Sequence, residues 1–110
     1  MMEQNEIRKK LKKTLDKERY EHTKGVMYTA GCLAMAHRYP IEKAMLAGLL
    51  HDCAKCLSTA EKIRLCEDHH ILMTAVELEN PGLLHAKAGM ALAEEQYGVT
   101  DPDILHAIKV

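Results

Sequence analysis

Residues 41–55 read IEKAMLAGLLHDCAK, an apolar run that ends in a histidine, an aspartate and a lysine. This run predicts a helix from Ile41 to about Ala54, since Pro40 before it costs little in a first turn. Small residues at positions 44, 47 and 48 keep one side of the helix thin, so a neighbouring helix can approach closely. An adjacent imidazole and carboxylate at a helix end can both reach one cation, and His51 and Asp52 therefore indicate a metal site.

Two further histidines are expected on apolar faces of other helices. The helical period over residues 20–38 places His22 on the same face as Val26 and Leu33, which predicts that His22 points inward. His85 falls on a small-residue face of a helix that begins near Leu84 and is stopped by a glycine. One such histidine is more often a hydrogen-bonded core residue than a ligand, but three on three helices indicate a metal site. Nitrogen and oxygen ligands favour iron, manganese, zinc or magnesium, ions that make hydroxide available near neutral pH.

Two cations are expected near these ligands. Lys55 lies about one turn beyond His51, and Arg19 lies three residues before His22. A guanidinium forms two parallel hydrogen bonds to phosphate oxygens, and a lysine acts as a movable point charge. Both residues are therefore suited to binding a phosphate. For Arg19, a surface ion pair with Asp16 or Glu18 is an equally good interpretation.

Three ordered motifs in this sequence resemble the HD-domain superfamily: RYEHT at 19–23, LLHDCAK at 49–55 and NPGLLHA at 80–86. Within that superfamily they are similar to the bacterial YqeK-like symmetrical bis(5'-nucleosyl)-tetraphosphatases. The resemblance implies a helical metal-dependent hydrolase, with a di-iron centre or another divalent metal, that cleaves diadenosine tetraphosphate into two ADP.

The resemblance also implies roles for individual residues. His22, His51 and Asp52 would bind the first metal, His85 would serve the second, and Asp52 would bridge the two. Asp52 and Lys55 would act in catalysis, with Lys55 and Arg19 contacting phosphate. Family members look to carry a further histidine directly after Val110 and a later aspartate. We therefore expect an incomplete protein without its C-terminal helices, or a degenerate copy.

The remaining patterns predict an all-α fold. A basic amphipathic helix begins the chain, and its basic face is better explained by solvation than by nucleic acid or membrane. Ser58 to Glu61 has the form of a capping box for a helix that runs toward His69. A short helix near residues 74–78 and a last helix over residues 103–110 follow. With 110 residues, the chain has the size of one HD domain, residues 1–110.

Composition limits the classes of partner. Fifteen basic and sixteen acidic residues give a net charge of −1, which offers no overall case for nucleic acid or anionic membrane. No apolar run approaches the length of a membrane span, and the four cysteines without an apolar leader favour a reduced, cytoplasmic protein. The apolar last helix would be covered in a homodimer, or by a following segment.

Two other functions remain open. Four residues imitate a structural zinc site through the spacings Cys-x-x-Cys and Cys-x-x-His: Cys53, Cys56, Cys66 and His69. Alternatively, the HD domain would bind metal and nucleotide without catalysis, as a sensor of dinucleoside polyphosphates. Outside the zinc alternative, four histidines are interpreted as surface or interface residues: His37, His69, His70 and His106.

Overall fold

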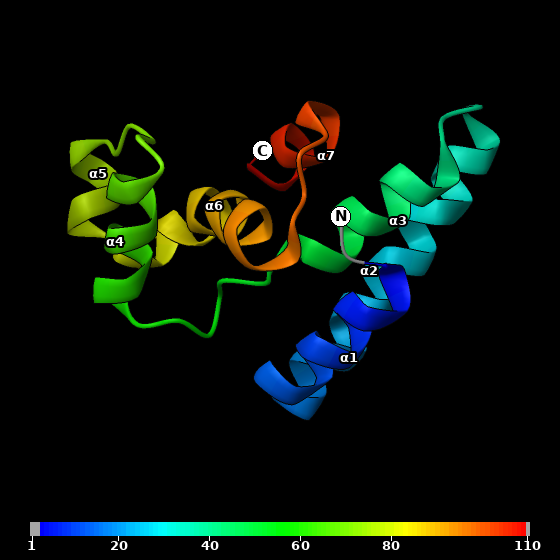
Figure 1. Cartoon of the computed structure of the whole chain (residues 1–110), viewed down its shortest axis with the longest axis horizontal. Helices are drawn as coiled ribbons and strands as arrows, with labels where there is room; N and C mark the ends of the chain where they lie inside the picture. The colour runs from blue at the N-terminus through cyan, green and yellow to red at the C-terminus, as the bar shows by residue number, and fades with distance from the viewer. Residues whose placement is uncertain (1–2, 110) are drawn as a thin grey trace.

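The computed structural model describes residues 3–109, and in this range it contains helices and no strands. The all-α prediction is therefore confirmed (Figure 1). The elements are α1 Gln4–Thr14, α2 Lys17–Ala36, α3 Ile41–Leu50, α4 Thr59–Asp68, α5 Ala75–Glu79, the 3₁₀ helix η1 Pro81–Leu84, α6 His85–Tyr97 and α7 Pro102–Lys109. None of the helices described is both long and apolar enough to cross a bilayer.

Capping residues set several of these boundaries. Ser58 precedes α4 and accepts a hydrogen bond from the amide of Glu61 at 3.2 Å, which confirms the predicted helix start. Thr74 and Glu77 form a reciprocal capping box at α5. Gly98 ends α6 with φ of 67°, a left-handed conformation that glycine adopts without a side-chain penalty. The last residue of the predicted final helix, Val110, lies outside the described residues.

The helices form two groups joined by α6. In Figure 1, α4 and α5 lie at one end of the molecule, α2 and α3 lie at the other, and α6 runs between them. α7 packs against both α3 and α6. Two clusters of buried side chains correspond to this division, and Leu92 packs against both. α1 joins the first cluster through Ile7 and Leu11, and Leu15, directly after the helix, belongs to the same cluster.

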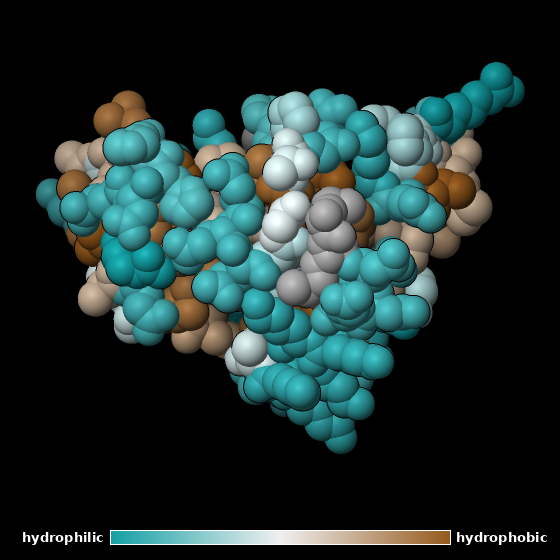
Figure 2. Space-filling model, viewed as in Figure 1, coloured by the Kyte–Doolittle hydropathy of each residue, from teal (hydrophilic) through white to brown (hydrophobic). Residues whose placement is uncertain are grey.

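Apolar side chains also remain at the surface of both ends. Figure 2 shows brown areas at the two ends of the long axis, on a face that is otherwise mostly hydrophilic. The large apolar residues exposed near α5 and η1 are Leu72, Val76, Leu78 and Leu83, and those around the α2–α3 connection are Leu33, Met35, Tyr39 and Ile41.

The predicted end of α3 is wrong by four residues. α3 ends at Leu50 rather than near Ala54. The chain then continues in tight turns, in which the amides of Cys53 and Lys55 donate to carbonyls three residues earlier, at 3.2 and 3.0 Å. This turn, which we call the HD turn (residues 51–56), positions Lys55, so Lys55 does not share a helix face with His51.

The predicted inner face of α2 is also wrong. The side of α2 that is buried carries Thr23, Met27, Gly31 and Ala34. His22 is exposed, and Leu33 on its predicted inner face retains 57% exposure. α2 carries apolar residues all the way round, so its periodicity does not single out one face. His22 therefore lies at the surface, along the edge where α2 meets α3.

Candidate metal centre

Three of the four predicted ligands come together in the structure. The second turn of α2 supplies His22, and the end of α3 supplies His51 and Asp52. One ligand atom from each of these residues lies within 4.8 Å of the others. The two imidazole rings have centroids 5.7 Å apart and are inclined by 58°. This is the only such group of metal-ligating side chains within residues 3–109.

Asp52 is the centre of this arrangement. Its side chain is 7% exposed, and its oxygen Oδ2 lies 3.1 Å from Nε2 of His51. The other oxygen, Oδ1, lies 3.6 Å from Nε2 of His85 at the start of α6. His85, the fourth predicted ligand, therefore faces the other oxygen of Asp52. It does not belong to the group formed by His22, His51 and Asp52.

Backbone carbonyls orient both rings. Nδ1 of His51 lies 2.7 Å from the carbonyl oxygen of Gly48, and Nδ1 of His85 lies 3.0 Å from that of Gly82. A carbonyl only accepts hydrogen bonds, so each Nδ1 carries the proton and, in a neutral ring, Nε2 presents its lone pair to Asp52. Sequence analysis missed both carbonyls, although a glycine stands three residues before each histidine.

This donor set fits a metal ion. The Nε2 atoms of His51 and His85 lie 3.1 and 3.6 Å from the two oxygens of one buried carboxylate, and with neutral rings these nitrogens and oxygens would all be acceptors. A buried carboxylate is costly unless it is paired, and a cation among these atoms would supply the missing partner. Imidazole nitrogen with carboxylate oxygen suits iron, manganese or zinc, and the geometry does not distinguish among them.

A small polar pocket adjoins the ligands. It has a volume of about 230 Å³, and it is lined by Asp16, Glu18, Arg19, His22, Asp52 and Lys55. The two predicted phosphate contacts therefore lie at the same pocket as two predicted metal ligands. Nε of Arg19 is buried without a hydrogen-bond partner in the described chain, and the nearest carboxylate oxygen, on Asp16, is 3.8 Å away. The alternative interpretation, an ion pair between Arg19 and Asp16, is therefore present only as a long contact.

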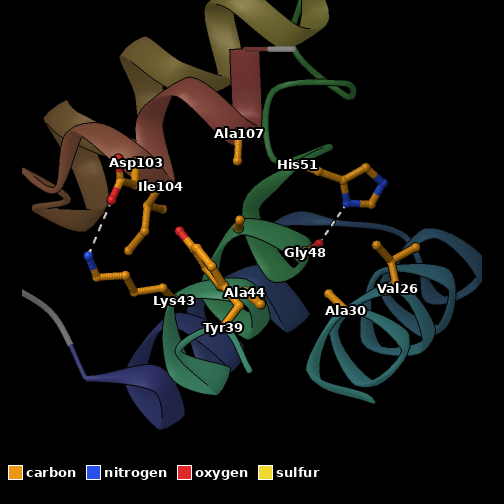
Figure 3. A pocket seen from close by; sticks show the side chains of 11 residues that line it. Val26, Ala30, Tyr39, Lys43, Ala44, Gly48, His51, Asp103, Ile104 and Ala107 are labelled. Carbon is orange, nitrogen blue, oxygen red and sulfur yellow. Dashed lines mark hydrogen bonds and ion pairs between the residues drawn. The ribbon is translucent and has the colours of Figure 1, made fainter. Parts of the chain in front are cut away.

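A second pocket, with a volume of about 390 Å³ and mostly apolar walls, is also lined by His51. It lies between α2, α3 and α7, and its walls include Val26, Ala30, Ala44 and Ile104 (Figure 3). Its cation, Lys43, is paired with Asp101 at 2.9 Å and with Asp103 at 3.4 Å. With apolar walls and a paired cation, this pocket offers little to a phosphate.

The alternative zinc site is not assembled. Its residues, Cys53, Cys56, Cys66 and His69, form no group of metal-ligating atoms within residues 3–109. Burial raises the pKa of the Cys53 thiol to about 12, and zinc binds the thiolate. The thiol instead donates to the carbonyl oxygen of Gly89 at 3.4 Å. His69 lies 3.5 and 3.7 Å from the carboxylates of Glu94 and Glu95 on α6.

In this helical bundle, a histidine of α2 lies beside a His-Asp pair at the end of α3. This combination of fold and site defines a helical metal-binding domain of the HD type. The HD domain family matches residues 19–109, and the chain belongs to this family. α1 lies outside the matched range.

Similar proteins agree with this assignment. The symmetrical bis(5'-nucleosyl)-tetraphosphatases of Halalkalibacterium halodurans and Bacillus subtilis are 35% and 36% identical to the chain, over 90% of its length. A crystal structure of a predicted HD superfamily hydrolase involved in NAD metabolism, from Clostridium acetobutylicum, matches with a TM-score of 0.93 and 38% identity. That match covers 99% of this chain and 58% of the other. The chain spans about half the length of the two curated relatives, 52% and 53%.

Proposed function

We propose that this protein is a metal-dependent phosphohydrolase, and that its substrate is diadenosine tetraphosphate, cleaved symmetrically to two ADP. One observation carries the proposal: ligand atoms of His22, His51 and Asp52 lie within 4.8 Å of one another, and the pocket lined by His22 and Asp52 also contains Arg19 and Lys55. A metal ligand set beside two cations suits a reaction in which an anionic phosphate is attacked by water. The names of the two curated relatives support the choice of substrate.

Each residue has a separate task in this proposal. His22, His51 and Asp52 would hold one metal, and His85, on the other oxygen of Asp52, would hold a second. The bound metal would act as a Lewis acid and lower the pKa of water. We propose iron, with manganese or another divalent ion as alternatives.

The phosphate would be held by the two cations of the pocket. The side chain of Arg19 is 30% exposed and lines the pocket, so the accessible part of its guanidinium would pair with phosphate oxygens. Lys55 is exposed and makes no ion pair with any described residue, so its ammonium can follow the phosphate as charge develops.

Product analysis tests the proposal on this chain. The purified protein, loaded anaerobically with Fe²⁺ or with Mn²⁺, is incubated with diadenosine tetraphosphate, and the nucleotides are separated by anion exchange. We expect ADP as the only product. A mixture of ATP and AMP would contradict symmetrical cleavage. Tight binding of the dinucleotide without turnover would instead support the non-catalytic binding function.

Matched variants separate the roles. Lys55→Ala should lower turnover by about 10²- to 10³-fold, the range found when one group that stabilises a transition state is removed, while metal content stays unchanged. Lys9→Ala removes an exposed lysine of α1, away from the pocket, and should have no effect. Equal turnover in the wild type and Lys55→Ala would remove Lys55 from the site.

A further inference from the structure

Gly48 occupies the closest approach between the two helices that supply the ligands. A Cβ atom built on Gly48 would lie 3.0 Å from Cα of Met27, 3.1 Å from the carbonyl oxygen of Val26 and 3.2 Å from the amide nitrogen of Met27. These three atoms belong to the backbone of α2, which cannot rotate away as a side chain can. Any side chain at position 48 would therefore have to push α2 and α3 apart by a few tenths of an ångström.

This contact is near the ligands along both helices. His51 follows Gly48 by three residues, and His22 precedes Met27 by five, so at 1.5 Å per residue the contact lies about 5 Å and about 8 Å from them along the axes. Figure 3 shows Gly48 beside Val26 and the hydrogen bond between the ring of His51 and the carbonyl oxygen of Gly48. His22 and His51 come from different helices, so the separation of the helices sets the separation of their rings.

A metal site tolerates little change in that separation. Imidazole nitrogens bind a first-row metal at about 2.0–2.1 Å, and a functional site keeps its geometry to within about 0.5 Å. The ligand atoms already spread over as much as 4.8 Å. A further displacement of α2 by a few tenths of an ångström would take up most of that tolerance and weaken the bond from His22 to an ion held by His51 and Asp52.

We propose that Gly48 is a positioning residue of the metal centre: by lacking a side chain it lets α3 lie against the backbone of α2 and so sets the distance between His22 and His51. This inference rests on the proposed metal site. The carbonyl of Gly48 orients the ring of His51 whatever side chain stands at position 48, so only the missing Cβ is tested by substitution.

The test is a double-mutant cycle in which Co²⁺ is the probe. Calorimetry measures the affinity of each variant for Co²⁺, and the visible spectrum of the bound ion reports its coordination. Gly48→Ala should bind Co²⁺ about 10- to 100-fold more weakly than the wild type and change its spectrum, while retaining the helical circular dichroism signal. His22→Ala should weaken binding in the wild type but cause little further loss in Gly48→Ala, because His22 is already displaced.

Gly31→Ala is the matched control. Gly31 lies on α2 at the same interface, but a Cβ there would meet Cγ and Sδ of Met45 at 3.0 and 3.3 Å, a flexible side chain. Gly31→Ala should keep the Co²⁺ affinity and spectrum of the wild type.

The outcomes separate the two proposals. Failure of the wild type to bind Co²⁺ would contradict the metal site itself. With binding intact in the wild type, normal affinity in Gly48→Ala, or fully additive effects of Gly48→Ala and His22→Ala, would overturn the positioning role. A Gly48→Ala protein that does not fold would also overturn it, because the glycine would then serve the fold as a whole.

Discussion

Asp52 is the residue on which the candidate centre depends most, because both of its oxygens face imidazole nitrogens. Asp52→Asn keeps the shape of the side chain and removes its charge. We expect metal affinity to fall by at least about tenfold, since an amide is a far weaker ligand than a carboxylate. Thermal stability of the metal-free protein should not fall, because a buried charge is removed. Calorimetric titration with Mn²⁺ and thermal unfolding after chelation measure the two effects.

Asp103→Asn is the control for this prediction. Asp103 is an exposed carboxylate that lies 3.4 Å from Lys43 and does not touch the ligands, so its loss should leave metal affinity unchanged. Equal affinities for Asp52→Asn and Asp103→Asn would show that Asp52 does not bind the ion.

At the scale of the element, α2 gives a direct test of which face is buried. Met27 is fully buried in the first cluster, whereas Leu33 is 57% exposed. Met27→Ala should lower the free energy of unfolding by about 2–5 kcal/mol, since it leaves a cavity between α2 and α3. Leu33→Ala should change it by less than about 0.5 kcal/mol. Urea denaturation compares them, and a larger loss for Leu33→Ala would restore the face predicted from the sequence.

The two errors of sequence analysis have physical causes. Helix boundaries at Ser58 and Gly98 were predictable, because capping and left-handed residues act locally. The inner face of α2 was not, because Met27 and Leu33 are both apolar and only the contact with α3 distinguishes them. The end of α3 was not predictable either. The HD turn is held by backbone hydrogen bonds to the carbonyls of Leu50 and Asp52, and no residue type in the sequence indicates such bonds.

None of the residues of α5 is buried, and an ion pair from Glu77 to Lys87 ties this helix to α6. The ammonium of Lys87 lies 2.8 Å from Glu77, and this hydrogen bond, followed by that from Thr74, lowers the pKa of Glu77 below its ordinary value of 4.5. A lowered pKa means that folding favours the charged carboxylate. The stabilisation is therefore present above pH 4.5 and lost as the pH falls through the folded pKa.

Glu77→Gln tests this contribution. The variant should be less stable than the wild type at neutral pH, and the difference should shrink on acidification below pH 4.5. Glu79→Gln changes a carboxylate on the same helix that makes no ion pair with described residues, and should follow the wild type. Urea denaturation across the pH range gives the comparison. A difference between Glu77→Gln and the wild type that does not vary with pH would contradict the assignment.

At the scale of the whole molecule, the candidate centre joins the two clusters. The HD turn contributes Cys53 to the first cluster and Ala54 to the second, directly after Asp52. His22 and His51 belong to the α2–α3 end, whereas His85 follows Leu84 of the second cluster. The sequence motifs predicted which residues meet. That they meet at the junction of two clusters depends on packing among distant segments, which the motifs do not contain.

A metal bound by residues from both groups should therefore stabilise both. Saturating Mn²⁺ should raise the thermal midpoint of the wild type, and at about a hundredfold excess over Kd the gain is about 2.7 kcal/mol. Hydrogen exchange should slow in α4 and α6 as well as in α2 and α3. His85→Ala should retain a smaller rise and lose the added protection of α4 and α6, because only the ligands at the α2–α3 end remain. The same rise and protection in His85→Ala as in the wild type would remove His85 from the centre.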